Sequence, residues 1–204
     1  MHLYINNMAK PKYDIIEVGE TFVYGRLHLD TAFDIYNSIT DEVDEAELEQ
    51  GEIGGDENNE PINANIRSNG VHWIRKSKKA RKLTQKLIDQ VNEDYFDLEF
   101  SESPDWQWTV YEDVDDHYNW HKDEDEDDRT DFERKLSISI CCTPSELYEG
   151  AEFFIKDGSE HNIRVFKMGY GEFIVFPSEI EHRVNALRAG ERESLVVWFG
   201  DYWD

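Results

Sequence analysis

Three side chains, the neighbours His121 and Asp123 and the distant His182, have the chemistry needed to hold a divalent transition metal. In an extended strand, residues i and i+2 point to the same face, so His121 and Asp123 can be directed at one point. Two imidazoles and one carboxylate on one face of a metal suit non-haem Fe(II) and leave its other positions open. We expect His182, several predicted strands later, to complete this site.

An arginine after His182 has a spacing suited to binding an organic acid. Arg192 lies beyond a predicted turn at Ala189-Gly190, and we expect a hairpin that places Arg192 on the strand beside His182. Its guanidinium could clamp a carboxylate through two hydrogen bonds, and Ser194 could donate another. The residues that share this strand face are Arg192, Ser194, Val196 and Trp198. The alternative is an ordinary ion pair with Glu191, Glu193 or Asp201.

The His-x-Asp spacing by itself is a weak signal. His28-Leu29-Asp30 repeats it, but that segment precedes a predicted helix, so we interpret it as part of a helix start. Asp123 also opens an acidic run over residues 123–128, and such runs are usually solvated turns. The metal-site hypothesis therefore depends on His182 and Arg192 lying near the first pair.

The second half of the chain favours short antiparallel strands. Between Lys135 and Cys142, apolar residues alternate with small polar residues, which is typical of a strand with one buried face. Eight such segments, separated mainly by Gly, Pro and Asp turns, indicate a sandwich or jelly roll. The predicted strands are Trp106–Tyr111, His117–Lys122, Lys135–Cys142, Ala151–Lys156, Asn162–Lys167, Glu172–Phe176, His182–Leu187 and Arg192–Phe199.

Two amphipathic helices are predicted upstream, and we expect them to pack on one sheet of a mainly β, α+β fold. Asp30 or Thr31 could cap the first helix and Ser77 the second. The predicted apolar faces are Phe33, Tyr36, Ile39 and Val43 in the first helix, and Ala80, Leu83, Leu87, Ile88 and Val91 in the second. We expect a single domain, with an N-terminal extension over residues 1–66 and a core over residues 67–204.

The charge of the chain limits its partners. It has 204 residues, with 46 acidic and 21 basic side chains and a formal net charge of −25. Such a field repels phosphate, so nucleic acids and anionic membranes are poor candidate partners. The acidic segment Asp41–Glu60 predicts a helix end followed by a loop, and the basic segment Arg75–Lys86 predicts a solvated helix face.

The expected location is the cytoplasm. No apolar run has the roughly 20 residues of a membrane helix, and residues 1–12 lack the apolar core of a secretory signal. The adjacent pair Cys141-Cys142 predicts two reduced thiols, because neighbouring strand side chains point to opposite faces.

Several segments together resemble the Fe(II)/2-oxoglutarate-dependent oxygenases of the prolyl 4-hydroxylase superfamily, in particular its small bacterial and phage members. The resemblance covers roughly residues 67–200. The segments that carry it are Tyr118 to Asp123, Arg134 to Ser137, Tyr148 to Glu152, Phe176 to Ser178 leading to His182, and Gly190 to Trp198, with Arg67 to Asn69, Trp73-Ile74 and the 77–95 helix upstream.

This resemblance implies a double-stranded β-helix, which is a jelly roll, with iron at one end. It implies that the iron ligands are His121, Asp123 and His182, and that Arg192 and Ser194 bind 2-oxoglutarate. Tyr111 would hydrogen-bond the same cosubstrate and Trp198 would line the pocket, although either could equally be core packing. The implied cofactors are Fe(II), 2-oxoglutarate and O2, with ascorbate as a candidate reductant.

The resemblance favours hydroxylation of a prolyl residue in a peptide or protein. The acidic loop beside the iron ligands would favour a basic polypeptide. A small-molecule hydroxylase, for example of a free amino acid, is the alternative, and a non-catalytic jelly-roll binding module is a second one. A virus-encoded protein in the cytoplasm of its host cell would also fit this expected location. The sequence leaves the oligomeric state open.

Overall fold

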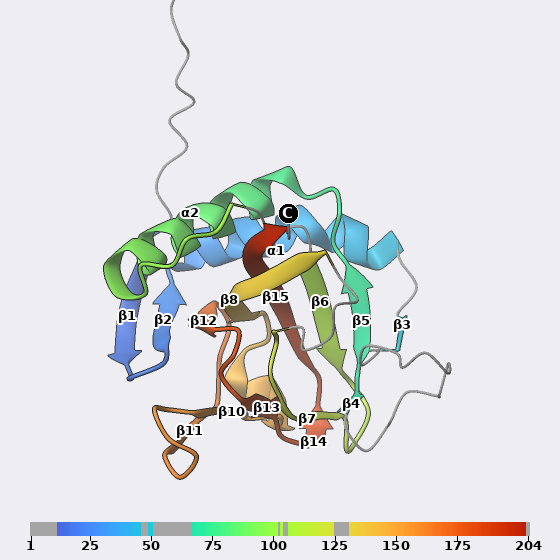
Figure 1. The fold of residues 1–204 in the computed structure, drawn as a ribbon. Coiled ribbons are helices and arrows are strands. Elements are labelled where there is room, and N and C mark those ends of the chain that lie inside the picture. Colours follow the sequence, from blue (N-terminus) through green and yellow to red (C-terminus); the bar gives the residue numbers. More distant parts are fainter. Residues whose placement is uncertain are drawn as a thin grey trace, which may run out of the picture.

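A large and a small antiparallel sheet face each other in this computed structural model, which describes residues 12–45, 49–50, 67–101, 103, 106–124 and 131–202 (Figure 1). The larger sheet has the order β1 (Tyr13–Val18), β2 (Val23–Leu27), β12 (Glu172–Pro177), β8 (Phe132–Cys141), β15 (Arg192–Tyr202), β6 (Trp106–Tyr111), β5 (Gly70–Trp73) and β3 (Glu49–Gln50). The smaller sheet has the order β11 (Ile163–Phe166), β10 (Phe153–Lys156), β13 (His182–Val184), β7 (His117–His121) and β4 (Arg67–Ser68).

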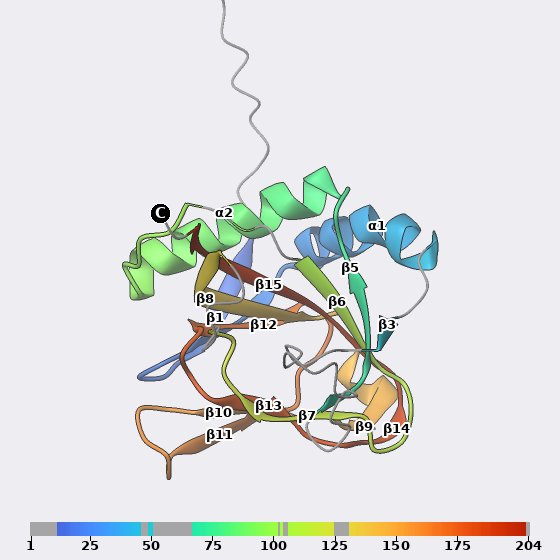
Figure 2. The same cartoon turned by 45° about the vertical axis from the view of Figure 1, so that its right-hand side comes forward.

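The chain passes repeatedly from one sheet to the other. After β6 in the larger sheet it forms β7 in the smaller one, then β8 in the larger, and later strands continue this exchange. A short pair, β9 (Tyr148–Gly150) with β14 (Leu187–Gly190), follows the 3-10 turn Ser145–Leu147 and lies at one end of the molecule (Figure 2). The predicted jelly-roll class is confirmed.

Two helices cover the outer face of the larger sheet, as predicted (Figure 1). They are α1 (Leu29–Glu45) and α2 (Lys78–Tyr95). The apolar side chains of the larger sheet that alternate with its polar ones, such as Leu136, Ile138 and Leu195, form one core with these helices. Neither described helix has the length and apolar character needed to cross a membrane.

The helix predictions need three corrections. Helix α1 begins at Leu29, so Asp30 and Thr31 lie in its first turn rather than at its cap. Phe33 is 60% exposed, whereas Ile39 is buried as predicted, together with Ala32 and Ile35 on the same face. Ser77 does occupy the N-cap of α2, and the predicted apolar face of α2 is buried. Its hydroxyl, however, donates to the carbonyl of Ser38 on α1 and makes no cap hydrogen bond.

The strand predictions were largely correct, with one split and several additions. The predicted strand 182–187 is two strands, β13 and β14, which belong to different sheets. Strands β1 and β2 were not predicted, and they extend the larger sheet beyond β12. Both cysteines are free and buried. Of the predicted acidic segment Asp41–Glu60, residues 41–45 end α1 and Glu49–Gln50 form β3. Residues 46–48, 51–60 and 125–128 lie outside the described residues.

Candidate active site

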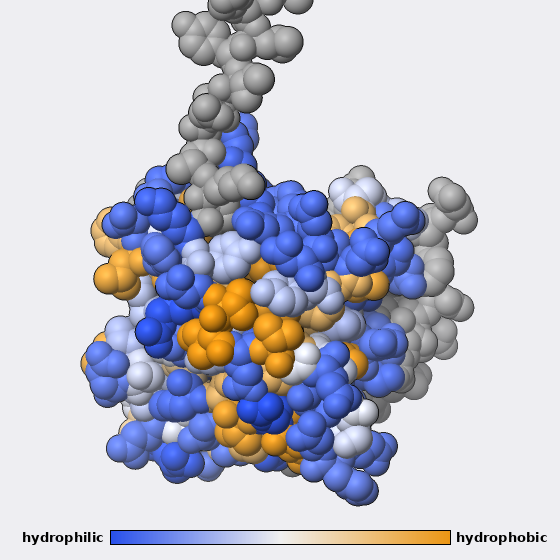
Figure 3. Space-filling model, turned by 90° about the vertical axis from the view of Figure 1, so that its left-hand side faces the viewer, coloured by the Kyte–Doolittle hydropathy of each residue, from blue (hydrophilic) through white to orange (hydrophobic). Residues whose placement is uncertain are grey.

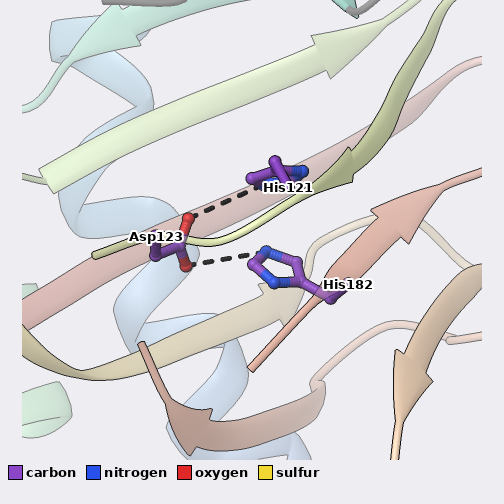
Figure 4. A group of neighbouring side chains, drawn as sticks. All are labelled: His121, Asp123 and His182. Atoms are coloured by element: carbon purple, nitrogen blue, oxygen red, sulfur yellow. Dashed lines mark ion pairs between the residues drawn. The ribbon is translucent and has the colours of Figure 1, made fainter. Parts of the chain in front are cut away.

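The structure brings the three predicted metal ligands together in one cluster. His121 and His182 are directly paired residues of the neighbouring strands β7 and β13, and Asp123 follows β7 by two residues. The Nε2 atom of His121 lies 3.6 Å from Oδ1 of Asp123, and Nε2 of His182 lies 3.6 Å from Oδ2 (Figure 4). One ligand atom from each residue lies within 4.8 Å of the others.

A backbone carbonyl holds one ring nitrogen of each imidazole. Nδ1 of His121 lies 2.8 Å from the carbonyl oxygen of Asn119, and Nδ1 of His182 lies 2.9 Å from that of Ile180. When each Nδ1 donates to its carbonyl, each Nε2 keeps a lone pair directed toward Asp123. Such partners on the far nitrogen are usual for metal-binding histidines.

The electrostatics of the cluster favour the protonation states that a metal requires. Burial raises the pKa of Asp123, but His182, His121 and hydrogen bonds lower it by more, so the pKa lies well below its usual value. Burial and then His121 lower the pKa of His182 from 6.5 to about 4. At neutral pH the carboxylate is therefore charged and His182 is neutral, as metal ligands must be.

The buried carboxylate of Asp123 makes the cluster suited to binding a cation. Asp123 is only 7% exposed, and its Oδ2 atom has no hydrogen-bond partner among the described residues. A buried charged oxygen without a partner is costly. Two neutral imidazoles and this carboxylate match the ligand set of non-haem Fe(II), and an ion bound by them would satisfy Oδ2.

The cluster opens into a cavity between the two sheets, lined by residues of both. Side-chain alternation in the larger sheet creates it, because one face of each strand packs on the helices and the other faces inward. In β6 the inward residues are Gln107, Thr109 and Tyr111, and in β15 they are Arg192, Ser194, Val196 and Trp198. The predicted shared face of β15 is thus present.

Arg192 lines this cavity at 1% exposure. Its Nε and Nη2 atoms have no hydrogen-bond partner within the described part of the chain, and Nη1 lies 3.3 Å from Oγ of Ser194. No ion pair joins it to a described acid: Glu193 instead accepts from Trp108, and Asp201 from Lys135. A buried cation with unused donors beside this histidine and aspartate cluster is suited to an anionic ligand.

The expected hairpin between His182 and Arg192 is wrong. Arg192 lies on β15, whose neighbours are β6 and β8 in the larger sheet, whereas His182 lies on β13 in the smaller sheet. Strand β14 intervenes between β13 and β15. Arg192 therefore reaches the cavity from the opposite sheet.

Tyr111 and Trp198 both line the cavity as well as packing in the interior. Tyr111 is the paired residue of Arg192 across β6 and β15, and the guanidinium carbon lies 5.5 Å from its ring centre. Trp198 packs against Arg134, whose guanidinium carbon lies 4.2 Å from the indole ring centre. Its buried Nε1 has no hydrogen-bond partner among the described residues.

Sequence reasoning missed several polar lining residues. Gln107 and Thr109 share a strand face with Tyr111, and they alternate with Trp106, Trp108 and Val110. This alternation of polar and apolar residues in a buried strand could have identified them. Arg67 and Tyr118 were noted only as parts of resembling segments, and both line the cavity.

His28, from the second His-x-Asp segment, lies at the start of α1, where its Nε2 atom is 3.3 Å from Oδ2 of Asp14.

Comparison with known families agrees with this geometry. Residues 106–200, which contain the whole cluster and Arg192, match the model of the 2OG-Fe(II) oxygenase superfamily. The matched segment is just under half of the chain. This similarity implies Fe(II), 2-oxoglutarate and O2 as the cofactor and cosubstrates.

The curated proteins to which this chain is similar include PKHD-type hydroxylases. One from Prochlorococcus marinus (strain AS9601) is 40% identical over 67 residues, which is 33% of this chain and 29% of the relative. One from Psychrobacter sp. (strain PRwf-1) is 35% identical over 86 residues, 42% of this chain and 30% of the relative. The matched segments thus span less than a third of these relatives.

Solved structures share the fold of this chain over most of its length. A Pseudomonas putida prolyl-4-hydroxylase superposes with a TM-score of 0.66 at 19% identity, covering 89% of this chain and 93% of that one. A Trichoplax adhaerens prolyl hydroxylase in complex with a hypoxia inducible factor peptide fragment gives 0.70 at 16% identity, covering 89% and 84%.

Proposed function

We propose that this protein is an Fe(II)- and 2-oxoglutarate-dependent dioxygenase that hydroxylates an unactivated C–H bond of a prolyl residue in a peptide or protein. The observation that carries the proposal is the shared cavity. A two-histidine, one-aspartate cluster opens into it, and so does a buried arginine with unused donors. A metal and an organic acid are the ligands that these two features suit.

Each residue has a definite task in this proposal. His121, Asp123 and His182 hold the iron, while Arg192 and Ser194 bind the distal carboxylate of 2-oxoglutarate. Tyr111, beside Arg192, hydrogen-bonds the same cosubstrate. Bound iron supplies the O2 chemistry, in which 2-oxoglutarate becomes succinate and CO2 and the substrate gains a hydroxyl group. The protein positions the reactants and excludes water from the cavity.

The prolyl substrate is supported by the relatives and by the cavity wall. A structural neighbour was solved with a peptide fragment bound, and another is a prolyl-4-hydroxylase. Val196 and Trp198 provide an apolar surface on the inward face of β15. The Nε1 atom of Trp198, which has no hydrogen-bond partner in the described part of the chain, could donate to a peptide carbonyl.

A small-molecule substrate is the second candidate. Neighbours of comparable TM-score include the α-ketoglutarate-dependent epimerase SnoN and carbocyclase SnoK, both from nogalamycin biosynthesis, each at 0.65. Incubation with proline-containing peptides and, separately, with free amino acids distinguishes the candidates. Mass spectrometry should show one added oxygen atom on peptide proline only, and oxidation of free amino acids alone would reverse the assignment.

Anaerobic titration with Fe(II) and 2-oxoglutarate tests the iron and cosubstrate sites. The parent protein should develop a visible metal-to-ligand charge-transfer band. Asp123→Ala and His182→Ala should not, although both should keep a cooperative thermal transition. A parent protein without such a band would refute the proposed function.

We also propose that the peptide substrate is basic, because an acidic run begins at the iron ligand Asp123. Replacing Glu124, Asp125, Glu126, Asp127 and Asp128 by their amides should raise the KM for a Lys/Arg-containing peptide at low salt. The KM for an uncharged peptide of equal length should change little. Equal KM values for the basic peptide in parent and variant would contradict basic selection.

A further inference from the structure

The two histidines of the cluster are held in place by different means. His182 is buried, and its imidazole packs beside Phe153 at 5.5 Å and Phe176 at 4.5 Å between ring centres. His121 is more exposed and lies at the very end of β7. Its imidazole stacks on the ring of Tyr118, with ring centres 3.4 Å apart and planes 12° apart.

The stack on Tyr118 holds the plane of the His121 ring, which the single hydrogen bond of His121 leaves free to rotate. One bond from Nδ1 to the carbonyl of Asn119 fixes that nitrogen but lets the ring turn about the bond. Contact with a parallel aromatic ring removes this freedom. Tyr118 is itself only partly buried, so its own position needs support.

Arg67 supplies this support from the neighbouring strand. Arg67 on β4 pairs with Tyr118 on β7, and its guanidinium carbon lies 4.6 Å from the Tyr118 ring centre. The guanidinium donates through Nε to Oδ1 of Asn69 at 2.6 Å and through Nη2 to Oε1 of Gln107 at 2.8 Å. Because Gln107 belongs to β6, Arg67 connects the smaller sheet to the larger one across the cavity.

We propose that Arg67 is a positioning residue for His121, acting through the ring of Tyr118 to hold the imidazole in the plane that Fe(II) binding requires. This inference rests on the proposed function. A rigid guanidinium with two fixed acceptors gives the Tyr118 ring a defined surface to pack on. Replacing a residue that orients a metal ligand typically lowers the metal affinity by about 10- to 100-fold.

Metal affinity measured without turnover tests this role. Co(II) titration of the purified protein, followed by its visible spectrum, gives both the dissociation constant and the coordination environment. We expect Arg67→Met and Tyr118→Leu each to weaken Co(II) binding by about tenfold. Their double variant should weaken it little further, because both changes interrupt one chain of contacts. Tyr118→Phe is the matched control, and it should bind within about twofold of the parent because it keeps the ring.

The outcomes separate the possible roles. Unchanged Co(II) affinity in Arg67→Met, with a raised peptide KM, would show a substrate contact and overturn the proposal. Additive losses in the double variant would also overturn it. Gln107→Met removes only one acceptor of Arg67, so it provides a second test if Arg67→Met fails to fold, and unchanged affinity there would count against the proposal. A parent protein that binds no metal would instead refute the proposed function.

Discussion

At the scale of single residues, Arg192 shows how a binding site conflicts with stability. Its guanidinium is buried, and two of its nitrogen atoms have no acceptor among the described residues. An uncompensated buried charge destabilises a folded chain, whereas a bound carboxylate would satisfy it. The unliganded protein therefore carries a cost that binding would remove.

Replacing this arginine should separate stability from affinity. We expect Arg192→Met to leave the free energy of unfolding of the unliganded protein unchanged or to raise it by about 1 kcal/mol. The affinity for 2-oxoglutarate should fall by about 100-fold, since a bidentate charge-assisted contact is lost. Urea unfolding and isothermal titration measure the two quantities. A large loss of stability with unchanged affinity would mean that Arg192 has a purely structural role.

At the scale of elements, a buried carboxylate joins β2 to β12. Glu172 accepts hydrogen bonds from Tyr24 and Arg26 on β2, and from the backbone N–H of Gly169 at 2.7 Å. Burial raises the pKa of Glu172, but these donors lower it by more, so the pKa lies below its usual 4.5. The network attaches the N-terminal hairpin β1–β2 to the jelly roll.

The pH dependence of stability should report this attachment. A lowered folded-state pKa means that the contribution of Glu172 is fully present above pH 4.5 and disappears as the pH falls through the folded-state value. Glu172→Gln should therefore cost about 2 kcal/mol at pH 7 and progressively less under acid conditions. Urea unfolding across this range measures the difference. A cost independent of pH would show that charge is not involved.

At the scale of the whole molecule, the surface is strongly acidic. The formal net charge is −25, and the face that carries β1 and β11 is mostly hydrophilic around a small apolar patch (Figure 3). The exposed apolar side chains of these strands are Ile16, Val18, Ile163 and Val165. Repulsion among so many like charges opposes the compact state.

Salt should relieve this repulsion. We expect the melting temperature to rise as NaCl increases from about 10 mM to about 500 mM, because the Debye length falls from about 30 Å to below 10 Å. Local ion pairs are weakened by the same screening, but acids outnumber bases by 46 to 21, so net repulsion should dominate. Differential scanning calorimetry measures this shift. A melting temperature that falls with salt would show that the ion pairs contribute more.

The sequence alone determined the local features of this protein. Strand alternation and turn residues predict most of the second half, because each depends only on neighbouring residues, and the helix α2 follows from its spaced apolar side chains. The three cluster residues and Arg192 could be selected from residue type, strand parity and the resemblance of the surrounding segments.

Tertiary structure decided which distant strands lie together. Sheet membership depends on long-range pairing, which local periodicity does not encode, so the expected hairpin beside His182 was wrong. The same holds for Phe33, whose exposure depends on which side of α1 meets the sheet. Arg67 gains its place only because β4 pairs with β7 and faces β6 across the cavity.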